Sequence, residues 1–375
     1  MKIAQIVPSL AEQHGGPSRS VRGLAAALAR LGDDVDLLTT RPKGEAEPVE
    51  EGRLRVLEFR RGVPGFLCPS AGLGEHLHRQ SYDCVHHHAL WLRTLHYAHE
   101  ASRITGARLV ISPRGMMSDW AWHHHQWRKQ LAQRFVHPGA FAGANGWHAT
   151  SEDEAAEIGR RGFSQPVCVA PNGVEAPTAE EVAHAHEVWT HHCPAVAARP
   201  VALFYSRFHR KKRLLELLDL WIAEAPVDWL LLVAGIPQEY SVADLEEHVQ
   251  REAGAGRIAV VDSRSLPPPY AVASLFLLPS HTENFGLVIA EAMAWGVPVL
   301  VTDTTPWAGV SGQQAGWCVP WGGYRAALRA ALDEPADQLE QRGARARDWM
   351  LSRYSWDQAA RPLHEFYQRL VGAET

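Results

Sequence analysis

Short apolar segments that alternate with helical patterns constrain the fold of this 375-residue chain more than any other feature. Up to about residue 170, segments such as 2–7 and 108–112 are predicted strands, and helical patterns such as 18–31 lie between them. The alternation restarts with a strand over residues 201–205 and a helix over residues 213–224. Because strands joined by helices form parallel sheets, we predict an α/β fold with two doubly wound domains.

The stretch from about residue 171 to residue 200 interrupts the alternation, because it is rich in alanine, histidine and proline and holds no clear strand. We therefore predict a Rossmann-like domain over residues 1–172, a linker over 173–199 and a second Rossmann-like domain over 200–375. The tail is predicted to be helical, and we expect its last helix to pack back on the first domain. Ligands bind beyond the carboxyl ends of strands in such sheets, so the loops after strands are the expected sites.

The composition excludes several classes of protein. Hydrophobic residues make up 46% and charged residues 21%, which is typical of a globular chain. The net charge of −5 argues against an electrostatic nucleic-acid binder. No apolar run approaches the roughly 20 residues of a membrane helix, and the N-terminal segment lacks the features of a secretory leader. Since the five cysteines form no C-x-x-C pair, we expect a cytoplasmic chain with reduced thiols.

The sharpest motif is Glu283-Asn284-Phe285-Gly286, with Glu291 farther along the same predicted helix. It follows an apolar strand, and Asn284 is a suitable N-cap. The N–H groups of Phe285 and Gly286 would then face an anion such as a diphosphate, which the helix dipole favours. Glu291 can accept hydrogen bonds from ribose hydroxyls. The alternative is that Glu283 is a surface acid at the helix start and Glu291 an ordinary helix residue.

Two further clusters follow predicted strands. Arg207 and Lys212 belong to a basic cluster at the start of the second domain, where such side chains can hold phosphate oxygens. The alternative is a solvated charged face. Gly15 and Gly16 follow the first strand and permit close approach of a ligand to the backbone. The chain has neither a G-x-G-x-x-G fingerprint nor a Walker A lysine, which argues against dinucleotide-binding and P-loop sites.

Two histidines, His86 and His88, alternate at the end of a predicted strand, so both side chains point to one face of the sheet. They can contact hydroxyl groups of an acceptor, serve as buried structural histidines, or bind zinc. No cysteine or carboxylate at ligand spacing accompanies them, which disfavours zinc.

Together these motifs resemble the GT-B glycosyltransferases of the retaining group 1 class, family GT4, over most of the chain. The residues that match the family's donor motif, diphosphate-binding pair and glycine loop are Glu283, Phe285, Gly286, Glu291, Arg207, Lys212, Gly15 and Gly16. Four segments resemble the subset that builds lipopolysaccharide, capsule and exopolysaccharide, namely residues 83–88, 112–116, 149–152 and 171–174.

The resemblance implies two domains that face each other across a cleft, with the acceptor on the first domain and the nucleotide sugar on the second. Glu291 would bind the ribose. The donor sugar and diphosphate would be held by Gly15, Gly16, Glu283, Asn284, Phe285, Gly286 and Leu287. Arg207 and Lys212 would neutralise the departing nucleoside diphosphate, so these two and Glu283 are the expected catalytic residues. Two cations and a helix N-terminus make a metal or other cofactor unnecessary.

The chain departs from the family at two positions. Many members carry a histidine at the carboxyl end of the strand that precedes Arg114 here. We expect Arg114, with His86 and His88, to contact the acceptor. Arg213 stands where a glycine commonly follows the lysine of the diphosphate-binding pair.

Residues 120–137 are predicted to form one helix that carries tryptophans and cations together. Trp120 and Trp127 lie one heptad apart, and Arg128 and Arg134 accompany them. This mixture is found on helices that lie on an anionic leaflet, and also on helices with one packed and one solvated face. With a lipid-linked acceptor, this helix is the expected place of peripheral contact with the cytoplasmic face of the inner membrane.

The sequence thus predicts a metal-independent, retaining hexosyltransferase that moves a sugar from a nucleotide-sugar donor to a hydroxyl of a growing cell-surface glycan. Its expected partners are the nucleotide sugar and a glycan or lipid-linked glycan acceptor, with no nucleic acid. The alternatives are a sugar-nucleotide epimerase or phosphorylase with the same fold, or a non-catalytic protein that binds nucleotides or glycans.

Overall fold

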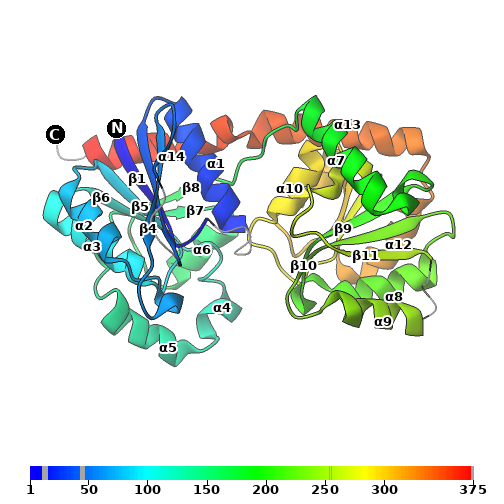
Figure 1. Cartoon of the computed structure of the whole chain (residues 1–375), viewed down its shortest axis with the longest axis horizontal. Coiled ribbons are helices and arrows are strands. Elements are labelled where there is room, and N and C mark those ends of the chain that lie inside the picture. Colours follow the sequence, from blue (N-terminus) through cyan, green and yellow to red (C-terminus); the bar gives the residue numbers. More distant parts are fainter. Residues whose placement is uncertain (11–15, 43–46, 253, 255, 373–375) are drawn as a thin grey trace. The chain divides into compact units, whose positions relative to one another are not determined.

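The computed structural model describes residues 1–10, 16–42, 47–252, 254 and 256–372, and the chain divides into two compact units (Figure 1). Unit 1 comprises Met1–Gly173 and Tyr354–Thr375, and unit 2 comprises Val174–Arg353. Within the described residues, no helix is both long and apolar enough to span a bilayer.

Unit 1 is built on an 8-stranded sheet in the order β3-β4-β2-β1-β5-β6-β7-β8. The strands are β1 (Lys2–Val7), β2 (Asp34–Arg41), β3 (Val49–Glu51), β4 (Leu54–Arg60), β5 (Cys84–His88), β6 (Arg108–Ser112), β7 (Gly146–Ala149) and β8 (Val167–Val169). All neighbouring strands are parallel except β3 and β4. Central strands such as β1 and β6 are buried and appear in the sequence as largely apolar runs, whereas the edge strand β3 is exposed.

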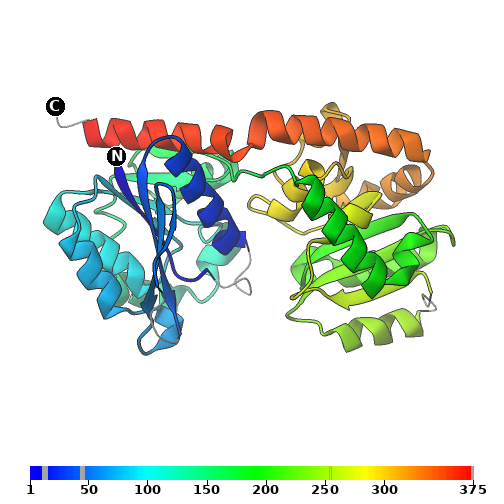
Figure 2. The same cartoon turned by 45° about the horizontal axis from the view of Figure 1, so that its top comes forward.

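Helices cover both faces of the unit 1 sheet (Figures 1 and 2). Along β1, Ile3 packs into the core with α1 (Gly16–Arg30) and α14 (Trp356–Gly372), whereas Ala4 packs into the core with α2 (Ala71–Arg79) and α3 (Arg93–Thr105). This alternation follows from the two-residue period of a strand. The short helix α6 (Glu152–Arg160) also packs on the α2 and α3 side.

The C-terminal helix α14 belongs to unit 1, where it packs against α1 and β8 (Figure 2). Two glycines permit the close approach. A Cβ at Gly23 of α1 would overlap the ring of Trp356, and a Cβ at Gly146 of β7 would overlap the ring of Phe366. The aromatic side chains of α14 therefore sit directly on the backbone of the first unit.

Unit 2 is built on a 6-stranded parallel sheet in the order β11-β10-β9-β12-β13-β14. Its strands are β9 (Val201–Phe208), β10 (Leu230–Pro237), β11 (Ile258–Asp262), β12 (Leu275–Leu278), β13 (Val299–Thr302) and β14 (Gly316–Val319). Its helices are α7 (Ala179–His192), α8 (Leu214–Glu224), α9 (Val242–Arg251), α10 (Leu287–Ala294), α11 (Gly309–Gly312), α12 (Trp321–Leu332) and α13 (Ala336–Tyr354). Both units therefore have the doubly wound α/β architecture that the sequence predicts.

The segment predicted as a linker, residues 173–199, contains the helix α7, and all of it except Gly173 lies in unit 2. Trp189 of α7 is fully buried, and its indole N–H donates to the carbonyl oxygen of Pro267 at 2.8 Å. A capping box formed by Thr178 and Glu181 begins the helix. The Thr178 and Glu181 pair can be read in the sequence, but the polar, histidine-rich composition of α7 gave no reason to predict a buried helix after it.

The prediction of one helix over residues 120–137 is wrong. The segment consists of α4 (Asp119–His123), α5 (Gln126–Leu131) and a π-helical turn over Ala132–Val136. His125 interrupts it with a φ of 52°, in the left-handed region that a continuing α-helix excludes. Trp120 and Trp127 therefore lie on different helices.

Candidate active site

The strand order of unit 2 reverses between β9 and β12, which are neighbours in the sheet. From β9 the chain first builds β10 and β11 on one side and then crosses to build β12, β13 and β14 on the other. Ligands of doubly wound sheets bind beyond the carboxyl ends of the strands at such a reversal. The basic cluster follows β9 and the glutamate motif follows β12, so the topology brings these two predicted clusters to one place.

Lys212 and Glu283 form an ion pair at this point. Lys212 lies in a single 3-10 turn over Arg210–Lys212, and only 7% of its surface is exposed. Its ammonium group donates to Oε1 of Glu283, which also accepts from the Ser280 hydroxyl at 2.6 Å. Burial opposes ionisation of Glu283, but the charge of Lys212 and these hydrogen bonds outweigh it and hold the pKa of the carboxyl below its usual value.

The turn that carries Lys212 is fixed at both ends. The ring of His209 accepts from the backbone N–H of Lys211 at 3.0 Å and so caps the turn. Arg213 ends it with a φ of 51°, in the left-handed region. Glycine adopts this backbone conformation without strain, whereas this chain places an arginine there. In this chain the Arg213 guanidinium lies 4.7 Å from the ring centroid of Trp321.

The helix after the glutamate motif begins later than the sequence predicts. Gly286, not Asn284, is the N-cap of α10, and it has a φ of 74°. The carbonyl oxygen of Phe285 accepts from the indole N–H of Trp307 at 2.6 Å, which holds the preceding loop outside the helix. The expectation that Phe285 and Gly286 open the helix is therefore wrong. The first helical amides belong to Leu287 and Val288, which have no acceptor inside the helix.

Glu291 lies just over one turn into α10, closer to the helix start than the sequence suggested. Its Oε2 accepts from the hydroxyl of Tyr270 at 2.9 Å. Tyr270 is buried in a 3-10 turn over Pro269–Val272, and the ring of Tyr205 stands perpendicular to it with centroids 5.5 Å apart. Tyr270 and Trp307, which orient the predicted donor residues, were missed because their partners lie on other loops.

Arg207 occupies the next-to-last position of β9, inside the strand rather than after it, and its side chain is exposed. Among the residues that the structure describes, no carboxylate lies within ion-pair distance of it. The candidate donor site therefore combines one exposed cation, one buried ion pair and the N-terminus of α10.

In unit 1, Gly16 is the first residue of α1, and Gly15 lies outside the described residues. His86 and His88 are fully buried, and protein groups occupy both ring nitrogens of each. This corrects the expectation that these two histidines contact an acceptor, since neither ring is accessible. Of the three predicted acceptor residues, the half-buried Arg114 reaches the surface.

His86, His88 and His148 each place one ring nitrogen within 4.8 Å of the others, a spacing that metal sites also have. Sequence reasoning missed His148 because only the pairing of β7 with β6 brings it near β5. All six ring nitrogens of the group have hydrogen-bond partners in the protein. Burial lowers the pKa of His148 to about 3 and that of the other two well below 6.5. The three rings are therefore neutral and hydrogen-bonded.

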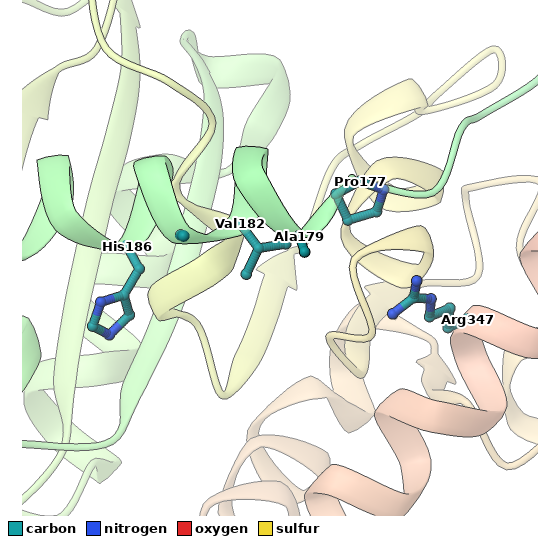
Figure 3. Close-up of a pocket in the computed structure, with 6 residues that line it drawn as sticks. Pro177, Ala179, Val182, His186 and Arg347 are labelled. Atoms are coloured by element: carbon teal, nitrogen blue, oxygen red, sulfur yellow. The ribbon is translucent and has the colours of Figure 1, made fainter.

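A pocket elsewhere in unit 2 contains none of the predicted site residues (Figure 3). It is lined by Pro177, residues of α7 such as Val182 and His186, and Arg347 of α13. The chemistry predicted from the sequence does not lie there.

Comparisons with known proteins agree with this division of the chain. Residues 15–173 match the family model described as "Glycosyl transferase 4-like domain", and residues 199–334 match "Glycosyl transferases group 1". Together the two matches span well over half of the sequence.

A D-inositol 3-phosphate glycosyltransferase from Xylanimonas cellulosilytica is 27% identical, over 94% of this chain and 91% of the relative. The lipopolysaccharide core biosynthesis mannosyltransferase LpsB of Rhizobium meliloti is 36% identical over 26% of this chain and 30% of the relative. A sucrose-phosphate synthase from Thermosynechococcus elongatus has a similar fold, with a TM-score of 0.78, 21% identity and 100% coverage of both chains.

Proposed function

Because the chain belongs to the group 1 glycosyltransferases of family GT4, which have the GT-B fold, we propose that it extends a cell-surface glycan. It is a retaining enzyme that depends on a nucleotide sugar. The proposed acceptor is a hydroxyl of a growing lipopolysaccharide, capsule or exopolysaccharide chain. Similarity to a lipopolysaccharide core mannosyltransferase over 26% of the chain supports this assignment. We place the reaction in the cytoplasm, where nucleotide sugars are made.

The observation that carries the proposed donor site is the buried Lys212–Glu283 pair at the β9–β12 reversal. A diphosphate bound there would meet Lys212, Arg207 and the first amides of α10. Its oxygens would share Lys212 with Glu283, which leaves the second carboxylate oxygen able to accept from donor sugar hydroxyls. Glu291, fixed by Tyr270, would bind the ribose.

The proposed chemistry needs no metal or other cofactor. As the bond between the sugar and the phosphate breaks, negative charge collects on the leaving phosphate oxygen. Preorganised cations and amides stabilise that charge where it forms. No side chain of the site is suited to be a covalent nucleophile, so the leaving oxygen takes the proton of the acceptor hydroxyl while the new glycosidic bond forms on the same face of the sugar.

We expect Glu291→Ala to weaken nucleotide binding about 10- to 100-fold, because the ribose loses hydrogen bonds to a charged acceptor. A thermal-shift screen with UDP-, GDP- and ADP-sugars identifies the nucleotide, since tight ligands raise the unfolding temperature. Titration calorimetry then compares wild type with Glu291→Ala. Glu247→Ala, which removes an exposed carboxylate from α9, is the matched control.

The same assays separate this function from its alternatives. Equal nucleotide affinity in Glu291→Ala and wild type would exclude the ribose assignment. Turnover of the donor without an acceptor would indicate an epimerase, and a requirement for inorganic phosphate would indicate a phosphorylase. Nucleotide binding without release of nucleoside diphosphate, whichever acceptor is offered, would indicate a binding protein.

We also propose peripheral contact with the inner membrane through α5 and the π-helical turn that follows it. Trp127, Leu131 and Phe135 are 60%, 47% and 64% exposed and lie four residues apart, on one helical face. The guanidinium groups of Arg128 and Arg134 lie 5.2 and 5.6 Å from the rings of Trp127 and Phe135, respectively. Exposed aromatic rings beside cations are suited to an anionic lipid surface.

Wild-type protein should therefore sediment with vesicles that contain anionic phosphatidylglycerol and remain in solution with neutral phosphatidylcholine vesicles. The double variant Trp127→Ala/Phe135→Ala should bind at least about fivefold less, because it loses most of the apolar area that enters the interface. Ile104→Ala removes a residue that is 66% exposed on α3 and should bind as wild type does. Equal binding of the double variant and wild type would exclude this surface.

A further inference from the structure

Hydrogen-bonded side chains form a continuous chain on the α14 face of the unit 1 sheet. In this chain the donor and the acceptor of each hydrogen bond can be assigned. The ring Nε2 of His148 lies 2.8 Å from the carbonyl oxygen of Ala170 and must donate to it. The Nδ1 of this neutral ring then accepts from the Ser112 hydroxyl at 2.7 Å. Since Ser112 has only one proton to give, its oxygen accepts from Nε2 of His86 at 2.9 Å.

This chain of hydrogen bonds continues through α14. With Nε2 of His86 donating, its Nδ1 accepts from the hydroxyl of Tyr367. The Tyr367 oxygen accepts from the side-chain amide of Gln5 at 3.0 Å. The carbonyl oxygen of Gln5 accepts from Nε2 of His88 at 2.6 Å, so Nδ1 of His88 is an acceptor. That nitrogen faces Arg114, whose Nη2 and Nε lie 3.0 and 3.3 Å away.

Arg114 is thus held by neutral acceptors, Nδ1 of His88 and, at 2.6 Å, Oδ1 of Asn172. No carboxylate of the described residues lies within ion-pair distance of its guanidinium. The acid that most raises the pKa of Arg114 is Glu154, whose oxygens accept hydrogen bonds from the backbone N–H groups of Gly115 and Thr150. A partly buried cation without a compensating anion is costly, and a bound anion relieves the cost.

Two N–H groups of the Arg114 guanidinium remain available to a ligand. A guanidinium has five N–H groups. The bonds to His88 and Asn172 use Nε and one N–H on each terminal nitrogen, so one N–H on each terminal nitrogen has no partner among the described residues. Such N–H groups can donate to the oxygens of a carboxylate or phosphate.

The backbone at Arg114 is fixed as well. Arg114 and Gly115 both have positive φ, 54° and 80°, in a turn closed by a bond from Met116 N–H to the Pro113 carbonyl oxygen at 3.2 Å. Glu154 holds the turn by accepting from the N–H of Gly115 at 2.5 Å. A non-glycine residue in this region is strained, and such strain is typical of functional positions.

We propose that Arg114 binds an anionic group of the acceptor, a phosphate or a carboxylate, and that His88 and Tyr367 are positioning residues that hold its guanidinium. This inference rests on the proposed transferase function, in which unit 1 binds the acceptor. His88 must be neutral to hold Arg114, because Nδ1 of a protonated ring would carry a hydrogen and could not accept a hydrogen bond from the guanidinium. Tyr367 of α14 accepts a hydrogen bond from Gln5, Gln5 accepts one from His88, and His88 accepts one from Arg114. The position of Tyr367 thereby helps to fix the position of the Arg114 guanidinium.

The test is a calorimetric titration of the full-length protein with inorganic phosphate and, separately, with acetate, which distinguishes a phosphate from a carboxylate. Arg114→Gln should bind the preferred anion at least about tenfold more weakly than wild type, as expected when a charge-assisted hydrogen bond is lost. Arg114→Lys should fall between them, because it keeps the charge but loses the planar guanidinium that His88 and Asn172 hold. Lys212→Ala should retain the Arg114 site, since it alters the separate anion site of unit 2.

Tyr367→Phe should weaken anion binding about three- to tenfold while nucleotide affinity stays within twofold of wild type. A lower unfolding temperature with unchanged anion affinity would show that Tyr367 is only structural and would overturn its positioning role.

Identical titrations of Arg114→Gln and wild type, or loss of anion binding in Lys212→Ala alone, would overturn the anion site at Arg114. Stoichiometric zinc bound to the histidines would also overturn it, because zinc takes the ring nitrogens that this chain of hydrogen bonds requires. Failure of every nucleotide to bind would refute the proposed function and leave the anion result standing.

Discussion

Replacing Lys212 with alanine is expected to lower the rate of sugar transfer about 10³-fold at saturating donor. Removal of one preorganised group that stabilises the charge of a transition state costs about 10²–10³ in rate, and Lys212 carries a full charge in a nearly buried position. The measurement is kcat for release of nucleoside diphosphate in the presence of acceptor. The same variant should bind nucleoside diphosphate more weakly, because the product carries the charge that Lys212 neutralises.

Two controls separate this effect from misfolding. Lys212→Ala leaves the buried carboxylate of Glu283 without its ion-pair partner, which is destabilising in itself. The double variant Lys212→Ala/Glu283→Gln removes that unpaired charge and should regain thermal stability without regaining activity. Arg210→Ala removes a cation from the same turn, where it pairs with Glu239, and should keep wild-type kcat. A Lys212→Ala enzyme with wild-type kcat would exclude the assignment of Lys212.

Acidification from pH 7 to pH 5 is expected to unfold unit 1 before unit 2. Burial lowers the pKa of His87 and His148 to about 3 and the pKa of His137 to about 4. It also lowers the pKa of His86 and of His88 to well below 6.5. A histidine in the unfolded chain titrates near pH 6.5. Below that pH the unfolded state therefore binds more protons than the folded state, and protonation favours unfolding. Stability is thus full above pH 6.5 and falls toward the folded pKa values.

The expected size of this loss is large. Each such histidine contributes about 2 kcal/mol of destabilisation at pH 5 relative to pH 7, and several together approach the roughly 5–15 kcal/mol that stabilises a typical domain. Hydrogen exchange measured peptide by peptide, corrected for the intrinsic effect of pH, reports both units in one sample. Strands β5 and β6 should lose protection while β9 and β12 keep it. Unchanged protection of β5 and β6 down to pH 5 would contradict the neutral state of these histidines.

Much of the fold was predictable because buried parallel strands appear as apolar runs. The predicted strands at residues 2–7 and 108–112 have the observed limits. The start of α10 was not predictable from capping preference, because Asn284 is the better N-cap and the left-handed φ of Gly286 depends on contacts with other loops. Helix α7 was missed because only two of its residues, Ala185 and Trp189, are buried in an otherwise polar segment.

The candidate donor residues could be proposed from the sequence because the glutamate motif follows one apolar strand and the basic cluster lies at the end of another. Their supports could not, because Tyr270 and Trp307 meet Glu291 and Phe285 only through the tertiary structure. The role of the histidines was hidden for the same reason. The partners of His86 and His88 include residues of β1, β6 and α14, which are far apart in the sequence, so no local pattern pairs them with these histidines.

The crystal structure of the full-length protein with the tightest nucleoside diphosphate from the donor screen tests the central claim most directly. We predict diphosphate oxygens within about 4 Å of Lys212 Nζ and the Arg207 guanidinium, the usual ion-pair distance. The amides of Leu287 and Val288 should face the same phosphate, and the ribose hydroxyls should donate to Glu291. A nucleotide bound away from the carboxyl ends of β9 and β12, with the Lys212–Glu283 pair untouched, would contradict the account.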